Sequence, residues 1–526
     1  MPAALILITG FVLALRLALG DYVVVKPSFF VATVSFIAAW LFLFCVKGDI
    51  RKPMAMRMLA IAVTMPLLAW SVPSLGLLFV IMCVWVPLAA GRFDLFAPVY
   101  LFSLLLLPGL DHTLMLGPVK LVEFGVHDAL ALGAALAIFV NPAKARGRVE
   151  WDFAVMLVVF TIAMATARET TASHHLRALT EISLELALPY YIVSRGLRSS
   201  EELKAAMLWL GASGVVVAGL LVFEVWKAWP IYQELYPLHE LPTLMLVKLR
   251  AGLIRAGGPF VEPTSVAMVL AICVTALYLS RDAMRNRGCY LLVIGALVAG
   301  LIAPQSRGAW IGAAIAIAAA DLLRGHYVQL GQKLFVVGGA VSMLFLSAQF
   351  DPALAETLGM SGGSSETSEY RRLLLSRGLE VFAERPFTGY SMRQLQELLP
   401  DLVQGEGIID FVNSYIWMML IAGLSGLLVF VAPFVLFLLA ILRRGRFQGA
   451  AKRDVEAGAF VFGILLMYLE MLFFTSFGTR PALCLFGCFG FAVAFLRLQH
   501  RPAEELVSTE EAPVPTASFE LRPIVP

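Results

Sequence analysis

Arginines beside apolar stretches are the first residues of this chain that could do chemistry. Arg307 lies in Pro-Gln-Ser-Arg-Gly-Ala-Trp, Arg480 lies in Gly-Thr-Arg-Pro, and Arg255 lies two residues before a Gly-Gly-Pro segment. A guanidinium group stays charged and its planar fork donates two hydrogen bonds at once to phosphate oxygens. Three arginines at one membrane surface would suit a lipid pyrophosphate. The alternative for each arginine alone is a membrane-surface anchor or a helix-end residue.

Carboxylates form a second group of candidates. Asp410 and Glu406 precede Asn413, which begins an apolar stretch, and Glu262 follows the Gly-Gly-Pro segment. A carboxylate at such a place can act as a general base. The alternative role of Asp410 is to cap the N-terminus of the following helix. Three further acids lie inside or near the ends of apolar stretches, where hydrogen bonding between helices explains them: Glu185, Glu224 and Glu470.

Metal and nucleotide chemistry are not indicated. The chain has no His-x-x-x-His or Glu-x-x-His pair, and His174 and His175 are adjacent, so they would point apart on a helix. Its six cysteines lie in or beside apolar stretches, as small buried hydrophobic residues do. A Gly-x-x-x-x-Gly-Lys phosphate loop is also missing from the sequence. We therefore expect no metal, no ATP and no other cofactor.

The elements that must position these residues are membrane helices. Hydrophobic residues make up 60% of the 526 residues, charged residues make up 15%, and the mean hydropathy is +0.84. Apolar stretches recur along the whole chain, and only helices satisfy their own backbone hydrogen bonds in lipid. We expect an all-α polytopic membrane protein with about 12 to 16 transmembrane helices of ~20 residues. The net charge of +3 gives no reason to expect nucleic acid as a partner.

Lysine and arginine cluster in short segments that predict the orientation. By the positive-inside rule these segments are cytoplasmic, which also places both termini in the cytoplasm. The clusters are 47–57, 141–150, 195–204, 281–287, 324–333 and 443–453. The segments expected on the outer, periplasmic side are 168–176, 226–262, 304–307, 350–411 and 475–480. The first apolar stretch, 1–20, contains Arg16 and no Ala-x-Ala site, so we expect a retained helix.

Two of the outer segments are too long to be turns, and they divide the chain. Long loops in compact proteins are usually functional or disordered, and an amphipathic stretch, 370–384, favours function for the second loop. The expected organisation is transmembrane helices over 1–225, a first periplasmic loop over 226–262, helices over 263–349, a second periplasmic loop over 350–411, helices over 412–498, and a disordered tail over 499–526.

Four segments together resemble the O-antigen ligase and polymerase superfamily of membrane glycosyltransferases (WaaL/Wzy-like). Arg255-Ala-Gly-Gly-Pro-Phe-Val-Glu-Pro is similar to the family's Gly-Phe-x-x-Pro-Asn segment, and Gln305-Ser-Arg-Gly-Ala-Trp resembles its Ser-Arg-Gly-Ala turn. The stretch from Tyr370-Arg-Arg to Glu384-Arg-Pro-Phe-Thr-Gly-Tyr resembles its outer-loop helix with a final Pro-x-x-Gly-x-Gly. Asn413-Ser-Tyr through Gly-Leu-Ser-Gly resembles its His-Asn-x-Tyr-Leu helix start. The four segments occur in the family's order over roughly residues 200–495.

The resemblance implies a bundle like that of GT-C lipid-sugar transferases in a bacterial inner membrane. Its substrate would be an oligosaccharide carried on undecaprenyl pyrophosphate, and a separate chain-length regulator would be a partner. The resemblance implies catalytic roles for Arg307 and Asp410. It implies pyrophosphate binding by Arg255, Arg371 and Arg372 as well, and residue type and position add Glu262, Arg480 and Asn413 as candidates for binding pyrophosphate or glycan.

Two departures from the family pattern bear on the reaction. Ligases have a histidine where this chain has Val412, and Asp410 lies where many polymerase-like members have an acid. We therefore favour polymerisation of repeat units over transfer of finished glycan to lipid A core or protein. The second glycine of the loop pattern is absent, since Ser391 follows Tyr390. A lipid-linked sugar flippase, or a non-catalytic assembly partner, is the alternative from a different class of protein.

Overall fold

The computed structural model describes residues 22–141, 151–241, 249–250, 252–351, 355, 364–403, 408–444 and 452–498, together with residues 10, 11, 14 and 16–18. Several sequence predictions lie outside these residues. They are the charge cluster after residue 141, most of the first apolar stretch, Glu406, and the tail over 499–526.

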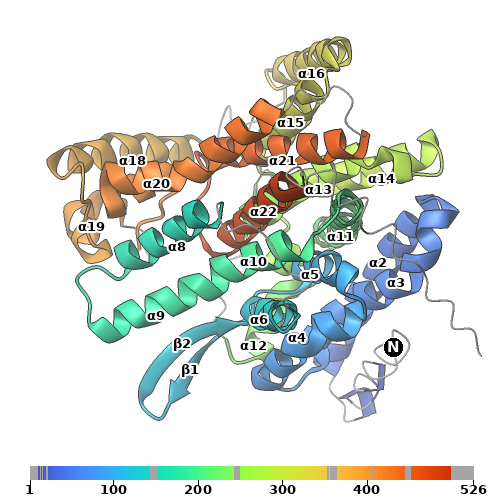
Figure 1. The fold of residues 1–526 in the computed structure, drawn as a ribbon, viewed down its shortest axis with the longest axis horizontal. Helices are drawn as coiled ribbons and strands as arrows, with labels where there is room; N and C mark the ends of the chain where they lie inside the picture. Colours follow the sequence, from blue (N-terminus) through green and yellow to red (C-terminus); the bar gives the residue numbers. More distant parts are fainter. Residues whose placement is uncertain are drawn as a thin grey trace, which may run out of the picture.

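The described chain is mostly helical, with helices packed side by side (Figure 1). The helices of the N-terminal half are α2 (Tyr22–Cys45), α3 (Gly48–Ser71), α4 (Leu75–Ala90), α5 (Phe96–Leu106), α6 (Val126–Phe139), α8 (Asp152–Thr166), α9 (Ala172–Ile182), α10 (Leu188–Gly196), α11 (Ser200–Lys227) and α12 (Leu235–Leu238). Those of the C-terminal half are α13 (Pro263–Leu279), α14 (Arg287–Ile302), α15 (Arg307–Leu323), α16 (Tyr327–Ser347), α18 (Ser364–Glu384), α19 (Met392–Leu398), α20 (Ser414–Arg444), α21 (Lys452–Met471) and α22 (Thr479–Leu498).

Six helices of the described chain are long and apolar enough to cross a membrane, or seven if α4 and α5, which are bent by 118°, form one span. This confirms a helical, polytopic membrane protein. The number is lower than the sequence suggested because four further apolar helices have only 14 to 17 residues. That length falls short of the ~20 residues that a perpendicular span needs.

Two small antiparallel hairpins interrupt the expected all-helical pattern. Strands β1 (Asp111–Leu116) and β2 (Val119–Gly125) pair around Gly117, whose φ is +59°. The hairpin projects from the bundle at the lower left of Figure 1. Strands β3 (Leu249–Arg250) and β4 (Leu253–Ile254) form a second hairpin directly before Arg255. These strands could not be predicted from the sequence, because an alternation of only a few residues inside apolar surroundings gives little signal.

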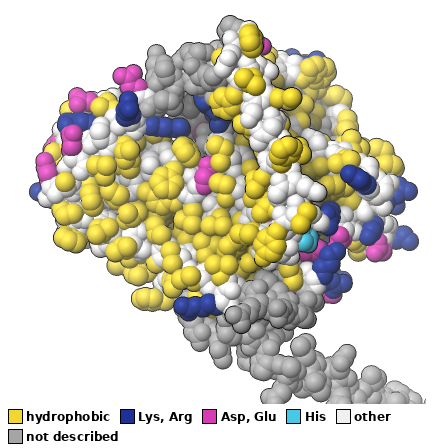
Figure 2. Space-filling view, turned by 90° about the horizontal axis from the view of Figure 1, so that it is seen from above, with side chains coloured by type: hydrophobic (Ala, Val, Ile, Leu, Met, Phe, Trp, Pro, Cys, Tyr) yellow, Lys and Arg dark blue, Asp and Glu magenta, His cyan; other side chains and the backbone are white. Residues whose placement is uncertain are grey.

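The segments predicted to share the cytoplasmic side meet at one end of the bundle. Lys452 contacts Asp282 at 2.5 Å, Arg453 pairs with Glu201, and the backbone N–H of Lys47 donates to the carbonyl of residue 283. These contacts join four of the predicted positive clusters. On the face that Figure 2 shows, hydrophobic side chains cover the middle, and charged side chains gather at the left and right margins. This pattern is typical of a membrane protein that presents two polar ends.

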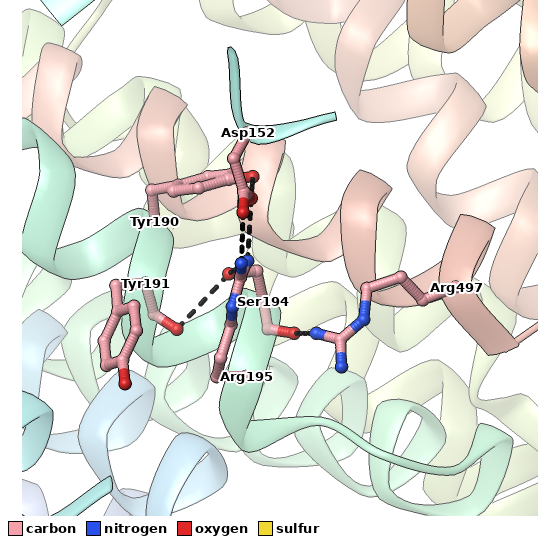
Figure 3. A network of polar contacts seen from close by, with 6 residues as sticks. All are labelled: Asp152, Tyr190, Tyr191, Ser194, Arg195 and Arg497. Carbon is pink, nitrogen blue, oxygen red and sulfur yellow. Dashed lines mark hydrogen bonds and ion pairs between the residues drawn. The ribbon is translucent and has the colours of Figure 1, made fainter. Parts of the chain in front are cut away.

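A buried ionic network ties three helices together at this same end (Figure 3). Asp152, in the first turn of α8, accepts two hydrogen bonds from the Arg195 guanidinium and one from the Tyr190 hydroxyl, and both donors lie on α10. The bond from Arg195 Nη1 is 2.8 Å long. Arg497, in the last turn of α22, donates to the Ser194 carbonyl. Because the ion pair is almost fully buried, loss of either partner would leave an uncompensated charge. The network therefore fixes how α8, α10 and α22 meet.

Helix α20 is broken where the second outer loop docks against it. Gly423 has φ of +68° and ψ of −168°, so the Leu424 N–H donates to the Pro386 carbonyl at 2.7 Å. The Leu420 carbonyl accepts from the Tyr390 N–H at 2.8 Å. A Cβ added at Gly423 would lie 2.4 Å from the Phe387 carbonyl. The break thus seats the loop segment 386–390 against a membrane helix.

Candidate arginine and carboxylate site

The first outer loop is folded around a buried carboxylate that positions Arg255. Glu224, in the last turn of α11, is 1% exposed, and its Oε2 accepts from the N–H groups of Gly257 (3.2 Å) and Gly258 (2.9 Å). A Cβ at Gly257 would lie 2.2 Å from the Val261 carbonyl oxygen, and φ of Gly258 is +52°. Only glycine fits both positions without strain. Glu224 therefore anchors this loop, a role different from the hydrogen bonding between helices that the sequence suggested.

Two arginines of the first loop hold the turn that precedes Arg307. Arg255 donates from Nε to the Pro304 carbonyl at 3.0 Å, and Arg250 donates from Nη1 to the Gln305 carbonyl at 2.9 Å. Gln305 is buried and has φ of +53°, an uncommon conformation for a residue other than glycine. The tight turn starts α15 at Arg307, which is half-buried. Contacts between two outer segments thereby place Arg255 beside Arg307.

Arg371 lies on the same side of the turn as Arg255 and Arg307: it donates from Nη2 to the Phe474 carbonyl at 3.4 Å, and Phe474 packs beside Gly308, the residue after Arg307. Burial lowers the pKa of Arg255; the Glu262 carboxylate opposes this change, whereas Arg307 and Arg371 lower the pKa further. Burial also lowers the pKa of Arg371, Arg307 adds to the effect, and Asp410 opposes it. Five of the residues predicted from the sequence are thus neighbours. The three cations outnumber the two carboxylates beside them, so this arrangement favours an anionic ligand.

Asp410 lies next to this cluster and does not cap the following helix. Its Oδ1 accepts from the Ser476 hydroxyl at 2.5 Å, and its backbone carbonyl accepts from the Tyr370 hydroxyl at 3.0 Å. The cap of α20 is Asn413, whose Oδ1 accepts from the N–H groups of residues 415 (3.0 Å) and 416 (3.2 Å). The alternative role considered for Asp410 is therefore wrong. Asn413 also satisfies a structural need that the resemblance did not assign to it.

Glu262 likewise has a capping role. Its two carboxylate oxygens accept from the N–H groups of Thr264, at 2.9 Å, and Ser265, in the first turn of α13. A negative charge at a helix N-terminus is favourable because the helix dipole is positive there. Glu262 therefore interacts with Arg255 electrostatically, while its carboxylate oxygens accept hydrogen bonds from backbone N–H groups.

Two predicted site residues are not brought into the cluster by the structure. Arg372, like Arg371, is exposed, and as the neighbour of Arg371 on α18 it points about 100° away around the helix. Arg480 donates to the Gly109 carbonyl at 3.0 Å and to the Tyr236 hydroxyl at 3.3 Å. Those contacts join the start of α22 to the base of the β1–β2 hairpin and to the first outer loop. The roles predicted for Arg372 and Arg480 in substrate binding stay predictions.

The structure also shows residues near the site that the sequence analysis did not select. Arg250 and Ser476 contact site elements directly, but an arginine and a serine in outer loops carry no pattern of their own.

Glu470, one residue before the end of α21, has both carboxylate oxygens buried with no hydrogen-bond partner in the described part of the chain. The prediction from the sequence that Glu470 forms hydrogen bonds between helices is therefore wrong.

The glycine pattern of the second loop has a clear structural basis. Gly389 has φ of +65°, and a Cβ there would lie 2.5 Å from the Leu420 carbonyl oxygen, so glycine is required. Ser391, which replaces the second glycine of the family pattern, is buried and caps α19 by accepting from the Gln394 N–H at 3.2 Å. Its hydroxyl also donates to Glu169 at 2.7 Å. The substitution therefore adds contacts between two outer segments.

Comparison with known proteins agrees with these features. The family described as O-antigen ligase (Wzy_C) matches residues 290–431. The matched region contains Arg307, Arg371, Asp410 and Asn413, whereas Arg255 precedes it. No curated protein matches the chain. Enzymes of the Wzy_C family transfer lipid-linked glycans, and the family is one of polytopic membrane proteins. Residues 290–431 of this multi-pass membrane protein are therefore an O-antigen ligase domain of the Wzy_C family.

Proposed function

We propose that the protein is a membrane glycosyltransferase that polymerises oligosaccharide repeat units carried on undecaprenyl pyrophosphate. The product would be O-antigen or exopolysaccharide, made at the periplasmic face of a bacterial inner membrane. The observation that carries the proposal is that three arginines gather at one turn: Arg255 donates to the Pro304 carbonyl before Arg307, and Arg371 donates to the Phe474 carbonyl beside Gly308. Asp410 is held at the same place by Ser476. Three cations suit a diphosphate, and one carboxylate suits proton transfer.

The reaction follows from these groups. A hydroxyl oxygen of the acceptor sugar attacks the anomeric carbon of the donor and forms the new glycosidic bond. The bond between that carbon and the pyrophosphate oxygen breaks, and the electron pair leaves with the lipid pyrophosphate. Asp410 takes the proton of the attacking hydroxyl. The arginines stabilise the charge that grows on the leaving group, and electrostatic stabilisation of this kind usually lowers the barrier more than any other effect in catalysis.

Ser476 supports the role of Asp410 as the base. Its hydroxyl donates to one carboxylate oxygen at 2.5 Å, which fixes the carboxylate and leaves the second oxygen for the acceptor. The N-terminus of α20 is already capped by Asn413, so Asp410 is not needed there. Arg371, which interacts with Asp410, links the base to the pyrophosphate end of the site.

Val412 is the observation that favours a polymerase over a ligase. A ligase that used a histidine before Asn413 as its base or phosphate partner would have no such group in this chain. The side chain of Val412 is instead half-buried and packs against the hydrophobic core. Ligation of finished glycan to an acceptor is the second candidate, because the Wzy_C family includes both reactions.

The experiment uses the purified full-length protein in lipid vesicles with a single lipid-linked repeat unit as the only sugar substrate. A polymerase uses this molecule as donor and acceptor, so a ladder of lipid-linked oligomers is expected on a gel. A ligase gives no ladder from this substrate but gives product once lipid A core is added. That second result would overturn the polymerase assignment.

A further inference from the structure

A groove of about 640 Å³ lies between the first turns of α2 and the end of α11. It is close to the arginine site because both are built on the same turn. Trp229 and Glu234 line the groove, whereas residues between them, Pro230, Tyr232 and Gln233, line a crevice beside Arg255. The groove is therefore separated from the arginine site by one short segment of the first outer loop.

The lining of the groove combines cations with aromatic rings. The Lys26 ammonium lies 5.1 Å from the centre of the Trp229 ring, and the Lys227 ammonium lies 3.9 Å from that of Trp226. The centre of the Phe30 ring lies 5.8 Å from that of Trp229 and 5.4 Å from that of Phe223, on which it stacks, so the inner wall of the groove is aromatic. Cations held over ring faces at a membrane surface are suited to a phosphate headgroup.

One carboxylate lies in the same groove. Glu234 accepts from the Trp229 indole N–H at 2.6 Å, which orients the ring. A carboxylate beside an aromatic ring can accept hydrogen bonds from sugar hydroxyls while the ring packs on the sugar face. The groove therefore offers places for a phosphate group and for a sugar that follows it.

The outer flank of the groove is apolar and open. Tyr22 and Val23, in the first turn of α2, are 70% and 74% exposed, and Trp226 is 72% exposed. In a membrane these side chains contact lipid, and tryptophan and tyrosine favour the interface with water. A ligand with a hydrocarbon chain could keep the chain in the bilayer while its headgroup enters the groove.

We propose that this groove holds the pyrophosphate end of the second lipid-linked sugar, the acceptor, with Lys26 and Lys227 on the phosphate oxygens and Trp229 against the first sugar. The proposal rests on the proposed polymerase function, in which two lipid-linked molecules bind at once. The acceptor reacts at the far end of its repeat unit, so its pyrophosphate needs a site of its own, separate from the arginines that hold the donor pyrophosphate. Its pyrophosphate is not cleaved, so lysines, which bind phosphate as simple point charges, are sufficient there.

The test counts bound lipid pyrophosphates by native mass spectrometry, with farnesyl pyrophosphate as the probe and the full-length protein in detergent. The wild type is expected to bind two molecules. The Lys26→Gln/Lys227→Gln double variant is expected to bind one, with at least a tenfold loss of affinity at the other site. The matched control is Lys52→Gln, an exposed lysine at the start of α3, which should keep both sites.

Competition and a second variant identify which site is lost. The Arg255→Gln/Arg371→Gln double variant should lose the other molecule, so the two double variants should each bind one. Phosphatidylglycerol should displace neither molecule at equal concentration. The proposal is overturned if the lysine variant binds two molecules with unchanged affinity. It is also overturned if phosphatidylglycerol displaces the molecule whose binding depends on Lys26 and Lys227.

Failure of the two proposals can be told apart. If the purified protein polymerises lipid-linked repeats but the lysine variant keeps two sites, only the groove assignment falls. If no polymerisation occurs but the lysines still determine one of two bound molecules, the polymerase assignment falls and a lipid-pyrophosphate site remains.

Discussion

Replacement of Arg307 by alanine is the perturbation for which the structure gives the clearest magnitude. Arg307 begins α15 directly after the turn that Arg255 holds, and its charge acts on both Arg255 and Arg371. At an effective dielectric constant of about 20, a unit charge about 4 Å from a phosphate oxygen contributes about 4 kcal/mol. Since about 1.4 kcal/mol corresponds to a tenfold change in rate, the full loss would be about 10³-fold.

The expected loss is somewhat smaller than this limit. Removal of Arg307 also relieves the repulsion that lowers the pKa of the two neighbouring guanidinium groups, so these bind the pyrophosphate better. We therefore expect kcat/KM for polymerisation to fall by about 10²- to 10³-fold. Arg307→Lys keeps the charge but loses the bidentate hydrogen bonding, so its kcat/KM should be about tenfold higher than that of Arg307→Ala.

The assay follows oligomer formation from a single lipid-linked repeat unit by the purified variants. The matched control is Arg393→Ala on α19, an arginine of the same outer loop that is 85% exposed and pairs only with the exposed Glu397 among the described residues. Activity of Arg307→Ala within about fivefold of the wild type, with equal protein recovered, would refute the electrostatic role of this residue.

Three further predictions concern the base, the neighbouring arginine pair and the break in α20. Asp410→Asn keeps the shape of the side chain but not its charge, so the same assay should show a loss of about 10²- to 10⁴-fold; unchanged activity would exclude it as the base. Arg371→Ala should reduce activity far more than Arg372→Ala, and equal losses would contradict the orientation of α18. Gly423→Ala should lower the thermal unfolding temperature, with a cost of about 1–3 kcal/mol for the strained backbone alone. Gly295→Ala, where a Cβ meets nothing within 4 Å, should not lower it.

The membrane class and the grouping of the basic segments at one end of the bundle could be predicted from the sequence because both depend on composition. Apolar stretches must be helices in lipid, and contacts such as Lys452 with Asp282 confirm that separate basic clusters share one end. Arg255 and Arg307 could be predicted as neighbours because a family resemblance placed both beside outer turns. Their contact depends on a shared turn at Pro304, which the resemblance does not describe.

Other features depend on contacts between distant segments and could not be predicted. Asn413 rather than Asp410 caps α20, and the carboxylate of Asp410 is instead held by Ser476, 66 residues away. The role of Glu224 requires two backbone N–H groups that lie more than 30 residues later. The break at Gly423 looks like an ordinary helical glycine until the loop that docks there is known.

The polymerase assignment is tested most directly by the size profile of surface polysaccharide in a strain that lacks this protein. If the protein is a polymerase, long polymer is lost while a single repeat unit still reaches its usual acceptor, and the wild type but not the Arg307→Ala variant restores the long polymer. Loss of all attached glycan, with full-length polymer left on the lipid carrier, would contradict it and would identify a ligase that works without a histidine at position 412.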